Sequence, residues 1–152
     1  ACLRWLKTQG IDPGYDPEWI DSGWLIKEKQ LFKVRAPGMT CIHSLKSRRV
    51  DDPLHNNSKG CGTVMRMAPV GLILPPEQAF EYGCQFSAIT PGHPTGITAG
   101  GAFAMLTAFL LEGKSLPLAL ELTGKHLQKL PEAAETLNAL QKAESAADIS
   151  EL

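Results

Sequence analysis

The chain has 152 residues, 43% of them hydrophobic, and a formal net charge of -1. This length and hydrophobic content are enough for one ordinary domain with a buried core. The near-neutral charge gives no reason to expect nucleic acid or an anionic membrane as the main partner. The four cysteines form no Cys-x-x-Cys pair and have no accompanying histidine spacing. We therefore expect free thiols and neither a zinc site nor a disulfide framework.

Two segments bear on where the protein resides. The start, Ala1 to Lys7, alternates charged and bulky residues and lacks the basic cap and apolar block of a signal peptide, so we expect a cytoplasmic protein. The longest apolar run, Ile97 to Leu111, is shorter than the ~20 residues of a membrane span and predicts a buried helix. The chain begins without methionine, inside a predicted helix, which predicts a fragment.

Helical spacing organises the first third of the chain. Apolar residues before Gly10 predict a short helix that ends at this glycine. The segment from Glu18 to Ile26 predicts one or two further turns, with Trp19 and Trp24 in the core. Stacking of an aromatic ring on a base is the alternative. Helical intervals resume from Met39 to Val50.

Charged residues follow this predicted helix. Lys46, Arg48 and Arg49 stand at its expected C-terminus, where the helix dipole favours cations without any ligand. The adjacent acids Asp51 and Asp52 could hold a metal or perform acid-base chemistry. Because a proline and a polar run follow them, we interpret the pair as a solvated loop and not as a catalytic site.

The stretch from Asn56 to Gly71 carries the main functional pattern. It passes from a polar loop, through Gly60 and Gly62 on either side of Cys61, into an apolar run that can start a helix. Glycines permit close approach of a ligand, and a following helix N-terminus attracts phosphate. The pattern is therefore compatible with an anion site, and a simple tight turn is the alternative. Arg66 either contacts the anion or braces the loop against a carboxylate.

The remaining chain predicts helices separated by proline and glycine. They are expected after Pro75-Pro76-Glu77, over Ile97–Leu111, from Ser115 to Leu130, and from Ala133 onwards. On the first of these helices, Phe80, Cys84 and Phe86 are predicted to share one buried stripe. No segment alternates like a strand, so the predicted fold class is all-α.

A second glycine-rich turn precedes the apolar helix. Gly92, Gly96 and Gly100 form a ridge of small residues, which indicates close approach of either a neighbouring helix or a ligand. His93 in this turn is typical of a surface residue, although its position beside the second turn keeps it as a candidate for the site.

Four motifs in this order resemble the ADP-ribosylglycohydrolase family, and the resemblance extends from the start to about Leu130. Asp51-Asp52 and the C-terminal tail lie outside it. The motifs are Leu3-Arg4-Trp5-Leu6, Arg35-Ala36-Pro37-Gly38-Met39-Thr40-Cys41, Ser58-Lys59-Gly60-Cys61-Gly62-Thr63-Val64-Met65-Arg66 and Gly92-His93-Pro94-Thr95-Gly96.

The resemblance implies a compact all-α, orthogonal helical bundle that cleaves the glycosidic bond of an ADP-ribosylated protein or a related ADP-ribose derivative. It also implies a pair of magnesium ions, which family members hold with a Thr-Asp-Asp-Thr motif near the N-terminus and an Asp-x-Asp-Thr/Ser motif near the C-terminus. Neither motif is in this sequence. Residues 1–152 are therefore expected to form a single partial domain, without metal ligands or catalytic residues.

The substrate-binding part of the family pattern is present. The resemblance implies that one loop surrounds the diphosphate and ribose and that a second loop borders the nucleotide. Three differences from the family stand out: Ile97 where an aromatic residue is common, Pro91 where histidine is frequent, and Met39 at a usually polar position. The implied substrate-binding residues are Gly60, Cys61, Gly62, Thr63, Met65, His93, Thr95, Gly96 and Ile97.

Three hypotheses follow. The first is the central substrate-binding segment of a magnesium-dependent ADP-ribosyl hydrolase, inactive by itself, with ADP-ribose or ADP-ribosylated protein as partner. The alternative is a non-catalytic module that binds ADP-ribose or another nucleotide. The third is a helical scaffold whose glycines serve packing alone. The first two require the turns around Cys61 and His93 to converge and line a nucleotide-sized cleft.

Overall fold

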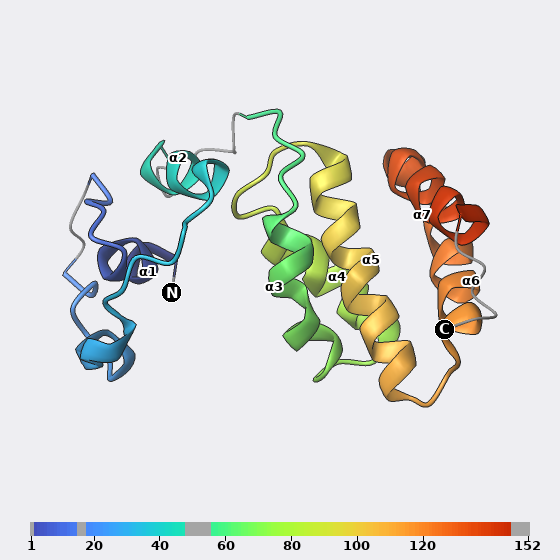
Figure 1. The fold of residues 1–152 in the computed structure, drawn as a ribbon, viewed down its shortest axis with the longest axis horizontal. Coiled ribbons are helices and arrows are strands. Elements are labelled where there is room, and N and C mark those ends of the chain that lie inside the picture. The colour runs from blue at the N-terminus through green and yellow to red at the C-terminus, as the bar shows by residue number, and fades with distance from the viewer. Residues whose placement is uncertain (1, 15–17, 48–55, 147–152) are drawn as a thin grey trace. The chain divides into compact units, whose positions relative to one another are not determined.

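The computed structural model describes residues 2–14, 18–47 and 56–146, and within these ranges it contains seven α-helices, three short 3-10 helices and no strand. The all-α prediction is confirmed. The chain divides into two compact units, Ala1–His55 and Asn56–Leu152 (Figure 1). The prediction that residues 1–152 form a single domain stays a prediction.

The first unit contains short helices joined by turns. Its elements are α1 (Cys2–Thr8), η1 (Leu25–Lys27), η2 (Lys29–Leu31) and α2 (Met39–Ser47). As predicted, α1 is short and precedes Gly10, whose φ of +71° is a left-handed conformation that suits glycine. The predictions for Arg48, Arg49, Val50, Asp51 and Asp52 lie outside the described residues.

A polar contact organises the start of this unit. The Arg4 guanidinium donates hydrogen bonds to the carbonyls of Trp19 (2.7 Å) and Ile20 (3.1 Å). It also lies over the Trp19 ring, 5.3 Å from its centroid, which leaves that ring 47% exposed. Trp24 is 72% exposed, so the prediction that these two tryptophans are core residues is wrong. Ile20 and Ile26 are the buried apolar residues of this segment.

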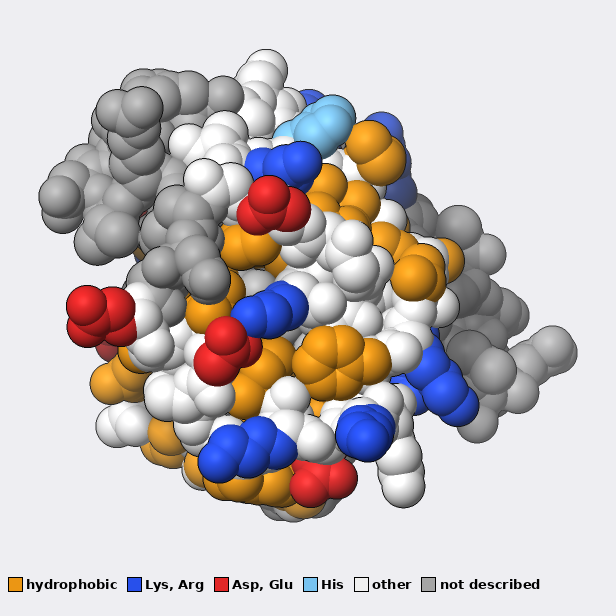
Figure 2. Space-filling model, turned by 90° about the vertical axis from the view of Figure 1, so that its left-hand side faces the viewer, with side chains coloured by type: hydrophobic (Ala, Val, Ile, Leu, Met, Phe, Trp, Pro, Cys, Tyr) orange, Lys and Arg blue, Asp and Glu red, His pale blue; other side chains and the backbone are white. Residues whose placement is uncertain are grey.

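Charges are mixed over the face drawn in Figure 2. Lysine and arginine side chains alternate there with acidic ones, and hydrophobic side chains lie exposed between them (Figure 2). This face shows no continuous patch of positive side chains that would attract a polyanion, in agreement with the formal net charge of -1.

The second unit is built around one long helix. Helix α5 contacts α3, α4, α6 and α7, and Figure 1 shows α3 and α4 on one side of it and the α6–α7 pair on the other. The short η3 connects α6 to α7. The bounds are α3 (Gly62–Gly71), α4 (Pro76–Ser87), α5 (Pro94–Leu111), α6 (Leu116–Leu127), η3 (Pro131–Ala133) and α7 (Ala134–Ala146).

Small residues let α4 and α5 approach closely. A Cβ atom on Gly83 would lie 2.9 Å from the Gly101 Cα, and one on Gly101 would lie 2.8 Å from the Phe80 carbonyl oxygen. Gly100 meets Ser87 in the same way, so one member of the predicted glycine ridge serves helix packing. By length and composition, α5 is long and apolar enough to cross a membrane. In this structure it packs against neighbouring helices, as predicted for a core helix.

One prediction for α4 is wrong. Phe86 is 44% exposed, whereas Phe80 is buried. Phe86 follows Phe80 by six residues, which places it about 120° away around an α-helix. Its ring instead lies near that of Tyr82, with 6.0 Å between centroids, on the exposed side of the helix.

Candidate functional site

Asn56 joins the two predicted substrate loops. Its side-chain amide donates to the Thr90 carbonyl (2.9 Å), and its Oδ1 accepts from the main-chain N–H of Ser58 (3.0 Å) and of Gly92 (2.8 Å). The His93 N–H donates to the Ser58 carbonyl (3.3 Å). The predicted convergence of the turns around Cys61 and His93 is therefore confirmed by direct contacts between them.

A buried contact connects the same loops one step further along the chain. The Thr63 hydroxyl donates to the Gly96 carbonyl at 2.8 Å, and Thr63 is 1% exposed. Gly92 is packed so tightly that a Cβ atom would meet the main chain of Asn56, with the carbonyl carbon at 3.0 Å. The sequence predicted that the glycine ridge allows close approach of a helix or a ligand. At Gly92 the close neighbour is instead the loop that contains Asn56.

His93 begins helix α5 and faces its first turn. It is the N-cap residue, its Nδ1 accepts from the Thr95 N–H at 3.1 Å, and Pro94 occupies the first helical position. The N-terminal proline is favourable because its missing N–H would have no helical partner there. With Nδ1 acting as acceptor, a neutral His93 carries its proton on Nε2. The side chain is half-buried and thus neither a free surface group nor a core residue.

Glu135, in the first turn of α7, binds both loops. Its Oε1 and Oε2 each lie 2.7 Å from the Lys59 Nζ, and the Thr95 hydroxyl donates to Oε2 at 2.7 Å. The hydrogen bond from Lys59 is the largest cause that lowers the Glu135 pKa, followed by that from Thr95; His93 adds a weaker effect of its charge. Lys59 and Thr95 thus share one carboxylate.

Sequence reasoning missed three members of this arrangement. Asn56 belongs to a polar run whose residue types favour local turns, a signal that predicts its bond to Ser58 but not those to the second loop. Lys59 lies within a quoted motif, yet nothing in the sequence indicates its partner. Glu135 is 76 residues from Lys59 and 40 from Thr95, and an acid in a first helical turn is usual without any site.

The other predicted site residues are arranged as follows. Cys61 is the exposed N-cap residue of α3, which starts without a side-chain cap, so its first N–H groups receive no capping side chain. The Gly60 N–H donates to the Ser58 hydroxyl (3.1 Å). Gly62 is already helical, so the unusual backbone freedom expected of it is not used. Met65 is 75% exposed on α3.

Arg66 connects helix α3 to the end of helix α4. Its guanidinium donates to the carbonyls of Phe86 (3.0 Å) and Ser87 (3.2 Å) at the end of α4. A cation at a helix C-terminus is favoured by the helix dipole. Arg66 therefore attaches α3 to α4 through the main chain of α4, and whether it also contacts an anion or a carboxylate stays a prediction.

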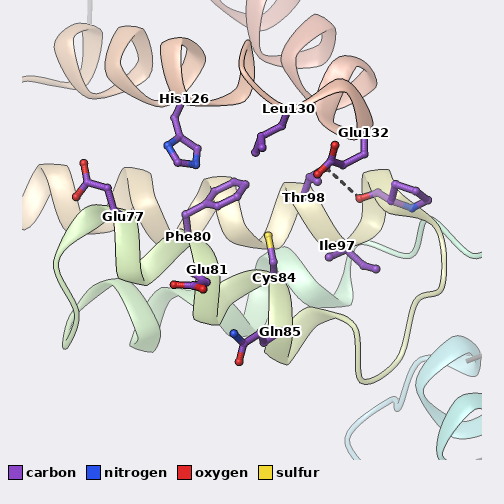
Figure 3. A pocket seen from close by; sticks show the side chains of 11 residues that line it. Glu77, Phe80, Glu81, Cys84, Gln85, Ile97, Thr98, His126, Leu130 and Glu132 are labelled. Atoms are coloured by element: carbon purple, nitrogen blue, oxygen red, sulfur yellow. Dashed lines mark hydrogen bonds between the residues drawn. The ribbon is translucent and has the colours of Figure 1, made fainter. Parts of the chain in front are cut away.

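A cavity of about 680 Å³ lies between α4, the start of α5, the end of α6 and η3 (Figure 3). Its apolar lining includes Phe80, Cys84, Ile97 and Leu130, and the carboxylate of Glu132 points toward it. Ile97 is the one predicted substrate residue in the lining, which includes no residue of the Cys61 loop. The predicted cleft between the two turns is thus not this cavity.

Two ionisable groups of the cavity are kept neutral by burial. Burial is the main cause that lowers the His126 pKa from 6.5, Lys129 adds to it, and Glu77 opposes it. The centroids of the His126 and Phe80 rings are 4.4 Å apart, and Figure 3 shows the two side chains next to each other. Burial also raises the pKa of the Cys84 thiol to about 11. The cavity therefore presents an uncharged thiol and an uncharged imidazole at neutral pH.

The described residues do not fit a magnesium site. Among them, no group of three or more histidine, cysteine, aspartate or glutamate residues is placed to hold a metal ion. Magnesium needs several oxygen ligands in nearly octahedral geometry, and Glu135 of α7 is the one carboxylate with a described hydrogen bond to the joined loops. We derive no chemical step through a metal from these residues.

Comparison with known proteins gives one family. A family model described as ADP-ribosylglycohydrolase matches residues 1–151 of this chain. No solved structure gives a significant match.

Proposed function

Because this chain belongs to the ADP-ribosylglycohydrolase family, we propose that its joined loops bind the ADP-ribose part of the substrate of a magnesium-dependent ADP-ribosyl hydrolase. The observation that carries the proposal is the set of contacts from Asn56, Ser58 and Thr63 to residues 90–96. These contacts give two segments, both expected to touch the nucleotide, one common surface.

The groups available at this surface suit an anionic ligand. The first turn of α3 has N–H groups without a side-chain cap, and the positive end of the helix dipole lies there. Exposed Cys61 marks the point where a ligand would approach these donors. We assign the diphosphate to this end of α3 and the neighbouring ribose to the side of His93 and Thr95.

Bond cleavage is assigned to the family and not to individual residues of this chain. The family is generally metal-dependent, and the described residues do not supply the metal ligands. We therefore expect residues 1–152 alone to bind ADP-ribose without hydrolysing an ADP-ribosylated protein. Release of ADP-ribose by the purified chain in a magnesium-dependent manner would contradict this part of the proposal.

A non-catalytic ADP-ribose-binding module is the second candidate, and the same loop contacts favour it. The two candidates differ only in whether the complete protein hydrolyses its ligand. An assay of ADP-ribose release by the full-length protein, with and without magnesium, separates them.

Calorimetric titration with ADP-ribose tests the binding that both candidates share. We expect saturable heat with the wild-type chain and its loss in Gly62→Trp, because the indole would cover the first turn of α3. Gly38→Trp is the matched control, since a Cβ atom at Gly38 meets nothing within 4 Å. Circular dichroism of each variant checks folding. Absence of heat in all three proteins would rule out the proposed site.

A further inference from the structure

The contact between Glu135 and the two loops has a consequence for ligand binding. One carboxylate engages Lys59 and Thr95 through oxygen–donor distances that are all 2.7 Å. Lys59 adjoins Gly60 of the diphosphate loop, and Thr95 belongs to the second loop. One side-chain donor from each of the two loops is thus already bound to an anion of the protein itself.

The two donors are chemically suited to phosphate. A lysine ammonium is a common phosphate partner, and a threonine hydroxyl donates equally to a carboxylate or a phosphate oxygen. A diphosphate carries more negative charge than one carboxylate, so Lys59 attracts it more strongly at the same distance. Both Lys59 and Glu135 are exposed to solvent, where an ion pair stabilises the fold only slightly. An incoming anion can therefore replace the carboxylate at small cost.

We propose that Glu135 is an internal competitor of the ligand diphosphate: in the free protein it occupies Lys59 and Thr95, and ADP-ribose displaces it from both. This inference rests on the proposed function, since it concerns the same loops. It makes Glu135 a residue that sets affinity without belonging to the catalytic chemistry.

Helix α7 does not depend on Glu135 to stay in place. The hydroxyls of Thr98 on α5 and Thr136 on α7 lie 2.7 Å apart, and both residues are buried. Leu137 and Leu140 pack against the hydrophobic core. Release of Glu135 therefore frees the two loops from one side chain while the helix remains attached.

The test compares the affinities of wild type, Glu135→Gln and Glu132→Gln for ADP-ribose and for inorganic pyrophosphate at low salt. Glu135→Gln should bind both ligands about three- to fivefold more tightly, the change that an exposed ion pair can supply. Glu132→Gln is the control, because it removes the same charge nearby but has no described contact with Lys59 or Thr95. Lys59→Gln should bind both ligands more weakly than wild type.

The outcomes separate this inference from the proposed function. If wild type binds ADP-ribose and Glu135→Gln binds it no more tightly than Glu132→Gln, the competition is refuted and the proposed function stands. If wild type binds neither ligand, the proposed function and the competition both fail. Thermal unfolding should show that Glu135→Gln is folded, as expected for an exposed side chain. Glu135→Asp keeps the charge but shortens the side chain, and it should give a smaller gain in ligand affinity than Glu135→Gln.

Discussion

Glycine closes two contacts in the second unit, and these contacts differ in what holds them. At the α4–α5 interface, Gly83 and Gly101 bring two helices together with no space for a side chain. At the loop junction, Gly92 brings two loops together, but hydrogen bonds that Asn56 and Glu135 accept keep them there. The interface is fixed by packing, whereas the junction is fixed by polar groups that a ligand can also use. The first is a scaffold, and the second can respond to binding.

Gly101→Leu should have the largest effect, because it overpacks the interface. The new side chain would begin 2.8 Å from the Phe80 carbonyl oxygen, and we expect a loss of about 3 kcal/mol in unfolding free energy. Urea unfolding followed by circular dichroism measures it. Gly124→Ala on α6 is the control: its Cβ would have only ordinary contacts, the nearest at 3.8 Å, so it should stabilise the protein by about 0.5–1 kcal/mol. Equal effects of the two variants would show that the interface is not tightly packed.

Asn56→Ala should break the junction and spare the interface. It removes the described hydrogen bonds to Ser58, Thr90 and Gly92, and we expect a loss of about 1–3 kcal/mol together with weaker binding of ADP-ribose. The same unfolding and calorimetric experiments measure both quantities. Asn57→Ala, at the exposed neighbouring residue, should change neither. Unchanged ADP-ribose affinity in Asn56→Ala would contradict the role given to the junction.

Acid should weaken the scaffold through His126. Because its folded pKa lies below 6.5, the unfolded state binds the extra proton first as pH falls. The stability that neutral His126 supplies is therefore complete above pH 6.5 and decreases as pH falls from there through the lowered folded pKa. The free energy of unfolding, measured over about three pH units around the usual histidine pKa, should show this slope. His126→Gln should reduce it, and exposed His43→Gln should not; a slope unchanged in His126→Gln would contradict the assignment.

Alkylation rates of two cysteines should distinguish the loop junction from the α4–α5 interface without any substitution. Cys61 is exposed, whereas the Cys84 thiol is held neutral by a pKa of about 11 and is packed against Gly101. Since the thiolate is the nucleophile, iodoacetamide at about pH 8, near the ordinary thiol pKa, should alkylate Cys61 much faster than Cys84. Mass spectrometry of the digested protein gives both rates. Faster alkylation of Cys84 would mean that the interface opens readily.

Sequence patterns predicted the scaffold better than the site. A proline lies in the first turn of α4, α5 and α6, because it acts through local backbone geometry. The helix predicted to begin at Ile97 begins three residues earlier, at Pro94, and the helix predicted to reach Leu130 ends at Leu127. The two tryptophans were misplaced because apolar character alone does not tell which face of a short turn is covered. Phe86 was misassigned because six residues do not return to the same face of a helix.

The convergence of the two loops was predictable only from the ordered family motifs. Spacing along the chain says nothing about distances between residues 30 or more positions apart. Glu135 illustrates this limit, because its partners lie in two segments that precede it by tens of residues. A first-turn glutamate has an adequate local explanation, and only the three-dimensional contacts distinguish it from an ordinary one.

Protection of Cys61 by ADP-ribose tests most directly whether the joined loops bind the ligand. With free ADP-ribose at about ten times its Kd, roughly one site in eleven remains empty, so the rate of Cys61 alkylation should fall by about tenfold. Cys2 and Cys41, in the first unit, should react at the same rate with and without ligand. An unchanged Cys61 rate at a ligand concentration that saturates calorimetric binding would contradict the account and place ADP-ribose elsewhere on the protein.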